Sequence, residues 1–234
     1  MTKRLIITGA SKGIGLATAE LFLKAGYQVL NLSRTTPPNS DIQHIAVDMS
    51  RHDWLSSHAA AILAFAENSS RLTLIHNAAA ITSDAVQNVQ MSELRRLLDI
   101  NVVAGAELNQ LLMPHMTGGD SILYVGSTLS EKAVANNFSY VISKHAVVGM
   151  MRATCQDLLG TGLHTACICP GFTDTEMLRR QVDNSEEILK SLAGNVTLGR
   201  LIAPKEIAET LFFAAENPVI NGAVLHANLG QIEH

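Results

Sequence analysis

A tyrosine and a lysine stand one helical turn apart in the segment FSYVISKHA. Four positions separate Tyr140 from Lys144, so on a helix both side chains share one face. A phenol is a weak acid at neutral pH, and a nearby ammonium group stabilises its phenolate form. The pair could therefore act as an acid and base, although one such pair also arises easily by chance in a chain of 234 residues.

A glycine-rich segment, TGASKGIG, follows the first predicted strand, Leu5–Ile7, and leads into a predicted helix. Gly9, Gly13 and Gly15 permit a tight turn and let a ligand approach the backbone closely. The start of the helix would present free N–H groups and the positive end of its dipole to a pyrophosphate. Such connections also occur without a ligand, but three glycines at the first strand–helix turn favour a bound dinucleotide.

Two further motifs accompany this loop: HNAA, and a serine, Ser127, after the predicted strand Ile122–Val125. Ser127 precedes Tyr140 by thirteen positions. Taken together with TGASKGIG and the Y-x-x-x-K pair, these motifs resemble the short-chain dehydrogenase/reductase family over almost the whole chain. The segments PGFTDTEM and LGRLIAPKEIAETLFFAAE are also similar to this family, which includes 3-oxoacyl carrier-protein reductases and carbonyl reductases. The resemblance implies an oxidoreductase that transfers a hydride between a nicotinamide and a carbonyl or alcohol substrate.

The resemblance also assigns four catalytic roles. Tyr140 would donate or accept the proton of the substrate oxygen, and Ser127 would hydrogen-bond and polarise that oxygen. Lys144 would stabilise the phenolate and hold the nicotinamide ribose, while Asn101, in LDINVVAGAEL, would help to route protons to the lysine through a water. Asn101 alone would more often be an ordinary helix asparagine, and Ser127 alone a strand-end cap. Their joint spacing favours the catalytic interpretation.

Further positions match the cofactor contacts of this family. Asp48 would contact the adenine with Met49 beside it, and Ala79 replaces the glycine of the usual N-N-A-G, adding a methyl group near the cofactor sugar. We interpret His76 and His145, which flank motif residues, as incidental. The expected cofactor contacts are Gly9, Ser11, Lys12, Gly13, Ile14, Gly15, Ser33, Arg34, Asp48, Met49, Asn77, Ala78, Ala79, Tyr140, Lys144, Pro170, Gly171, Thr173 and Thr175.

The end of the second predicted strand, Gln28–Leu32, predicts which cofactor binds. A site for NAD usually carries an acid there, about 20 residues past the glycine loop, to bind the ribose 2′-hydroxyl. Here Ser33 takes that place, Arg34 follows, and the next carboxylate is Asp41. Arg34 can bind a phosphate through two N–H groups, and Lys12 adds a second charge. Each cation alone could simply face solvent, but together they predict NADP(H).

The substrate is expected between the Leu129–Phe138 loop and the Phe172–Leu192 segment. Its predicted contacts are Ser127, Leu129, Phe138, Phe172 and Met177, with Val134 and Leu178 as further apolar candidates that could equally be core. Ketones, aldehydes, quinones and 3-oxoacyl thioesters are all candidate substrates. The alternative function is a regulatory protein that binds NADP(H) without turnover, although a sensor has no need for all four catalytic residues.

These residues require a scaffold of alternating strands and helices. Short apolar runs alternate with longer helical patterns and no linker interrupts them, which predicts a single doubly wound parallel sheet, a Rossmann fold, over residues 1–234. The other predicted strands are Ile42–Val47, Leu72–His76, Thr165–Ile168 and Ala223–His226. The predicted helices are Ile14–Ala25, Trp54–Phe65, Ser92–Met113, Tyr140–Leu159, Glu176–Leu192 and Pro204–Ala215.

Composition excludes several other classes of protein. The hydrophobic fraction of 47% is ample for a core, and a net charge of −4 without a basic block disfavours nucleic acid. No apolar run reaches the length of a membrane span, and the N-terminal MTKRLIITGA resembles the start of a strand more than a signal peptide. Three cysteines in such a chain predict a reduced, cytoplasmic protein without disulfides or a metal site, in which Cys167 and Cys169 are buried as small apolar residues.

Self-association is a further expectation from the resemblance. The predicted helices Ser92–Met113 and Tyr140–Leu159 are long, rich in apolar residues and poor in charge, as expected for contact surfaces between subunits. We therefore expect a homotetramer, or failing that a homodimer.

Overall fold

Seven parallel strands form one sheet in the order β3-β2-β1-β4-β5-β6-β7. The computed structural model describes residues 2–231; Met1 and residues 232–234, which belong to the single domain predicted for residues 1–234, lie outside the described residues. The strands are β1 (Thr2–Thr8), β2 (Gln28–Ser33), β3 (Gln43–Ala46), β4 (Ser69–His76), β5 (Ser121–Val125), β6 (His164–Pro170) and β7 (Val224–Ala227). The predicted Rossmann fold is confirmed.

From β1 to β3, successive strands are added toward one edge of the sheet, and from β4 onward they are added toward the other edge. Strand β1 pairs with β2 on one side and with β4 on the other, so the connection from β3 returns past β1. In a doubly wound sheet, ligands bind beyond the carboxyl ends of the strands at this switch point. The predicted glycine loop after β1 and the HNAA segment after β4 therefore lie side by side at the expected edge.

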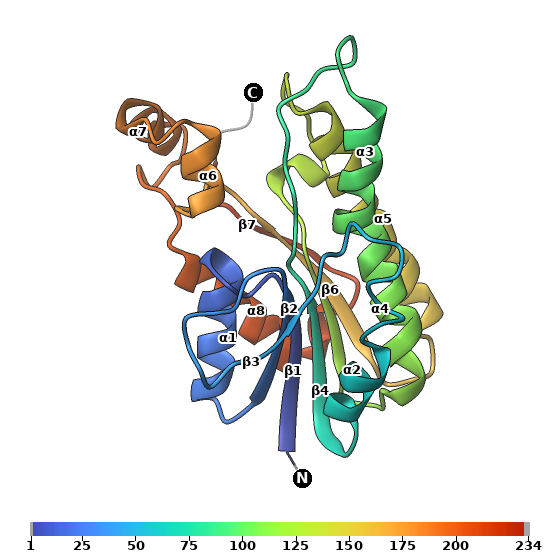
Figure 1. Cartoon of the computed structure of the whole chain (residues 1–234). Coiled ribbons are helices and arrows are strands. Elements are labelled where there is room, and N and C mark those ends of the chain that lie inside the picture. Colours follow the sequence, from blue (N-terminus) through green and yellow to red (C-terminus); the bar gives the residue numbers. More distant parts are fainter. Residues whose placement is uncertain (1, 232–234) are drawn as a thin grey trace.

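Helices cover both faces of the sheet (Figure 1). The helices are α1 (Gly13–Lys24), α2 (Ala59–Ala66), α3 (Met91–Leu98), α4 (Ala104–Leu112), α5 (Phe138–Asp157), α6 (Glu176–Gln181), α7 (Glu186–Gly194) and α8 (Pro204–Glu216). Helices α1 and α8 lie against one face, and α2, α4 and α5 lie against the other, while α6 and α7 stand beyond the strand ends (Figure 1). Within residues 2–231, no helix combines the length and the apolar character that a membrane crossing requires.

Successive residues of a strand enter two different cores. Leu5 and Ile7 pack with Phe22 of α1, whereas Ile6 between them packs with Leu108 of α4. Side chains alternate across a strand, so a strand buried on both faces reads as a continuous apolar run. This explains why the short runs in the sequence predicted the sheet well.

Two predicted helices are interrupted. The helix predicted at Ser92–Met113 consists of α3, a π-helical segment at Asp99–Val103, and α4. The helix predicted at Glu176–Leu192 ends at Gln181 and restarts as α7, because Asp183 and Asn184 adopt left-handed φ values of 49° and 56°. Asp and Asn tolerate this conformation better than most residues, so they allow the break.

The helix predicted at Trp54–Phe65 begins later than expected. Residues 51–58 form turns, and α2 starts at Ala59. The hydroxyl groups of Ser56 and Ser57 both donate to the carbonyl oxygen of Asp53. Such local side-chain bonds compete with a regular helix and favour turns.

Candidate active site

A cleft of about 810 Å³ opens at the carboxyl ends of the strands. Its wall contains every residue predicted to hold the cofactor, from Gly9 in the glycine loop to Thr175 before α6. It also contains Ser127, Leu129, Val134, Phe172, Met177 and Leu178 from the sets predicted for catalysis and substrate. Segments far apart in the sequence thus share one cleft that is large enough for a dinucleotide and a small substrate.

The glycine loop is fixed to the end of β4 by hydrogen bonds. The Thr8 hydroxyl accepts the backbone N–H groups of Asn77 and Ala78, both at 2.9 Å. The Asn77 amide donates to the carbonyl oxygens of Thr8 at 2.9 Å and Gly9 at 3.0 Å. Gly9 has a φ of +72°, and a Cβ at Gly15 would collide with the Gly9 carbonyl and the Asn77 amide. The loop therefore has a fixed shape that requires glycine at both positions.

Ser127 follows β5 and caps a short 3-10 helix, Thr128–Ser130. Its Oγ accepts the N–H of Leu129 at 3.1 Å, and its own N–H donates to Ser130 Oγ at 3.1 Å. Its Oγ accepts one hydrogen bond, which leaves the O–H donor and one further lone pair for a ligand in the cleft.

Two buried cysteines of β6 pack behind Ser127. A Cβ at Gly126 would lie only 2.7 Å from Cys169 Sγ and 2.8 Å from Cys167 Sγ, so the residue before Ser127 must be glycine. The two Sγ atoms are 3.9 Å apart, and their hydrogen bond lowers the pKa of the Cys169 thiol and raises that of Cys167. Burial as small side chains, predicted for both, is confirmed.

Tyr140 and Lys144 lie on one face of α5, and both are buried. The Lys144 Nζ atom is 5.6 Å from the centre of the Tyr140 ring and donates to the Val125 carbonyl oxygen at 2.8 Å. The start of α5 is held by Asp84, whose carboxylate accepts the backbone N–H of Ser139 at 3.0 Å and also the Ser139 hydroxyl. Sequence reasoning missed Asp84, which lies far from α5 along the chain.

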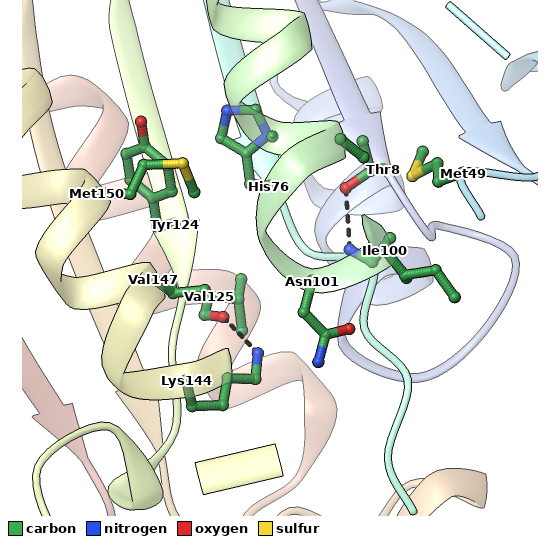
Figure 2. Close-up of a pocket in the computed structure, with 13 residues that line it drawn as sticks. Thr8, Met49, His76, Ile100, Asn101, Tyr124, Val125, Lys144, Val147 and Met150 are labelled. Atoms are coloured by element: carbon green, nitrogen blue, oxygen red, sulfur yellow. Dashed lines mark hydrogen bonds between the residues drawn. The ribbon is translucent and has the colours of Figure 1, made fainter. Parts of the chain in front are cut away.

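Asn101 does not line the large cleft. It lies in the π-helical segment, at a small cavity that it shares with Lys144 and His76 (Figure 2). Its amide donates to the Ala80 carbonyl and to Ser143 Oγ, both at 2.9 Å, and its Oδ1 accepts the Ala80 N–H at 2.7 Å. The side chain thus ties α5 to the loop after β4, and the predicted proton route through Asn101 stays a prediction.

A model of the enoyl-(acyl carrier protein) reductase family matches residues 9–231. The chain belongs to the short-chain dehydrogenase/reductase family. It is 29% identical to the 3-oxoacyl-[acyl-carrier-protein] reductase FabG of Chlamydia trachomatis over 98% of this chain and 97% of that protein. It is 27% identical to carbonyl reductase family member 4 of Xenopus laevis over 96% of both chains. The ligand-free structure of Thermoplasma acidophilum aldohexose dehydrogenase is also 27% identical, with a TM-score of 0.90, over 98% of this chain and 93% of that one.

As a short-chain dehydrogenase/reductase, the protein is an oxidoreductase of a family that acts on carbonyl or alcohol groups. These relatives do not favour the alternative of a regulatory protein without turnover. Among residues 2–231, no group of three or more His, Cys, Asp or Glu side chains could hold a metal ion.

His76 occupies the first position of the family's N-N-A-G motif and points away from the large cleft. Its Nε2 lies 2.8 Å from Asn109 Oδ1, and the Asn109 amide donates to the Tyr124 hydroxyl at 2.6 Å. The oxygen of Asn109 must therefore accept from His76, which places the proton on Nε2. Burial lowers the pKa of His76 to about 4, so the ring is neutral at pH 7. Its contacts are with the core of this short-chain dehydrogenase/reductase, in agreement with no direct role at the cleft.

Phe138 was predicted to contact substrate, but it does not line the cleft. It is the first residue of α5, and its N–H donates to the Asp84 carbonyl at 3.1 Å. Successive residues of a helix are rotated by about 100°, so a residue two positions before Tyr140 points to a different side. The preceding residue, Asn137, lines the cleft instead.

Motif matching also missed several residues of the cleft wall. Most of them lie in the two segments predicted to enclose the substrate, although they were not predicted individually. They include Ala80, Ile81, Lys132, Ala133, Asn137, Glu176, Gln181, Val182, Leu192, Asn195 and Gln231. Glu176 could have been noticed, because it directly follows the predicted contact Thr175.

Proposed function

We propose that this protein is an NADPH-dependent oxidoreductase that interconverts a carbonyl compound and an alcohol, with Tyr140 as general acid and base. The observation that carries the proposal is the position of Ser127, Tyr140 and Lys144 in the same cleft as the glycine loop. A dinucleotide on that loop would extend toward these three side chains.

Each of the three side chains has hydrogen-bonding capacity suited to its proposed role. Ser127 can donate its O–H to a substrate oxygen while its Oγ accepts the N–H of Leu129. Lys144 uses one N–H on the Val125 carbonyl, which leaves two donors for a ribose. The Tyr140 hydroxyl would exchange the proton of the substrate oxygen. The bound cofactor would supply or accept the hydride.

Ser33 and Arg34 support the choice of NADP(H). Both line the cleft after β2, where a site for NAD would carry an acid. The Ser33 hydroxyl donates to the Thr35 carbonyl at 2.8 Å, and Arg34 is exposed, so its guanidinium can reach a ribose 2′-phosphate. A charge-assisted contact of this kind contributes roughly 1.5–3 kcal/mol.

Replacing Arg34 tests the cofactor assignment. Arg34→Ala should weaken NADPH binding by about ten- to a hundredfold and leave NADH binding nearly unchanged, because only NADPH carries the 2′-phosphate. The preference should invert when Arg34→Ala is combined with Ser33→Asp. Dissociation constants and kcat/KM with both cofactors measure this. A wild-type protein that uses NADH as well as NADPH contradicts the assignment.

The cleft also indicates what kind of substrate to test. Its substrate end combines apolar side chains, including Leu129, Phe172 and Met177, with the amides of Asn137 and Gln181. Arg179 pairs with Asp174 and Glu186, so its charge is already engaged by carboxylates. We infer a small, uncharged carbonyl compound rather than a substrate on an acidic carrier. A screen of NADPH oxidation against ketones, aldehydes, quinones and 3-oxoacyl thioesters tests this inference.

A further inference from the structure

Helix α6 lies directly over the glycine loop. A Cβ at Gly13 would be only 3.3 Å from Cγ2 of Thr175, the N-cap of α6. Beside this contact, the Lys12 ammonium forms an ion pair with the Glu176 carboxylate at 2.8 Å. Both side chains of the pair line the large cleft. The cation predicted to bind a 2′-phosphate is therefore already paired with a carboxylate of the protein.

Glu176 is charged at neutral pH. The hydrogen bond from Lys12 lowers its pKa, and the positive charge of Arg180 adds to this effect. Arg180, one turn further along α6, also contacts the Glu176 carboxylate. Glu176 thus lies between two cations, one on the glycine loop and one on its own helix.

We propose that Glu176 is a specificity-determining residue that competes with the cofactor's 2′-phosphate for Lys12, and so selectively lowers the affinity for NADP(H). This inference rests on the proposed use of NADP(H). A phosphate that takes Lys12 must displace Glu176, and a carboxylate that stays nearby repels the phosphate. NAD(H) has a hydroxyl at the same position, so it does not compete for Lys12 there, and any repulsion of its pyrophosphate is common to both cofactors.

Replacing Glu176 by a phosphate as the partner of Lys12 should cost little free energy. The Lys12 and Glu176 side chains are 53% and 44% exposed, so water can replace each partner's contact. Glu176 keeps Arg180 as a partner after it leaves Lys12. The competition should therefore tune affinity rather than prevent binding.

Glu176→Gln removes the competing charge and keeps the shape of the side chain. We expect NADPH to bind about three- to tenfold more tightly, with NADH affinity unchanged within about twofold. Dissociation constants from calorimetry of the 234-residue protein give this result without a substrate. Glu186→Gln is the matched control, because Glu186 is an exposed acid of the same region that pairs with Arg179 and not with Lys12.

A second background tests the route through Lys12. In Lys12→Ala protein, Glu176→Gln should change the NADPH affinity less than in the wild type, because the competition for the cation is gone and only the repulsion of the phosphate remains. An unchanged or weaker NADPH affinity in the single Glu176→Gln variant overturns the inference, as does an equal gain for NADH. Failure of the proposed cofactor would look different, since wild-type protein would then show no preference for NADPH.

Discussion

The two walls of the cleft are built by different kinds of contact. The sheet-edge wall, formed by the loops after β1, β4 and β5 and by the start of α5, is held by bonds to buried or partly buried backbone groups, such as those of Asn77 and Lys144. The α6 wall, residues 174–192, carries ion pairs of exposed or partly exposed side chains, such as Arg179 with Glu186 within the wall and Glu176 with Lys12 across to the glycine loop. Leaving a buried polar group unpaired costs about 1–3 kcal/mol, whereas an exposed ion pair contributes about 0–1 kcal/mol.

The two walls should therefore differ in how much a substitution costs. The residues proposed for proton transfer all stand on the sheet-edge wall, where displacement would leave buried groups without partners. The residues proposed to meet substrate and to tune cofactor affinity stand partly on the α6 wall, where solvent can replace the exposed ion pairs at little cost. Substitutions on the sheet-edge wall should therefore strongly reduce activity or stability, and substitutions on the α6 wall should have small effects.

The largest effect is expected at Tyr140. Tyr140→Phe should lower kcat/KM by roughly a hundred- to ten-thousandfold, because the ring stays in place and only the proton-transferring hydroxyl is lost. NADPH affinity should stay within a few-fold of the wild type. Steady-state kinetics and a binding titration measure the two quantities. Near-normal turnover would show that the sheet-edge wall does not supply the proton.

A stability effect of intermediate size is expected at Asn77. Asn77→Ala removes the donors to the Thr8 and Gly9 carbonyl oxygens and should lower the free energy of unfolding by about 1–3 kcal/mol. Asn137→Ala is a matched control, since its exposed amide contacts Ala135 and Gln181 on the surface and should cost less than about 1 kcal/mol. Urea denaturation compares the two. Equal losses would remove the distinction between buried and exposed contacts.

The smallest effect is expected on the α6 wall. Arg179→Gln breaks the ion pairs with Asp174 and Glu186, yet it should change the free energy of unfolding by less than about 1 kcal/mol, because solvent replaces these contacts. The effect should also shrink as salt is added. Denaturation at low and high ionic strength checks this. A loss as large as that of Asn77→Ala would mean that α6 is as firmly fixed as the sheet edge.

Features that depend on local spacing could be predicted from the sequence. Apolar runs marked the strands, because a strand covered on both faces needs apolar residues at successive positions. The four-residue interval between Tyr140 and Lys144 placed both on one face, since a helix returns to the same side after about 3.6 residues. The absence of an acid after β2, together with Arg34 and Lys12, likewise predicted NADP(H) from residue types at motif positions, a prediction that the cofactor measurements will test.

Contacts between residues far apart in the sequence could be identified only from the folded structure. Asn101 bonds to Ala80 and Ser143, and these contacts place it behind the cleft rather than in it. Lys12 meets Glu176 because the connection after β6 brings α6 back over the first loop of the chain. The π-helical segment after α3 and the direction of Phe138 were likewise not predicted from the sequence, and they are seen only in the folded chain. Contacts between segments far apart in sequence leave no periodic signal, so they become visible only when the sheet has brought those segments to one edge.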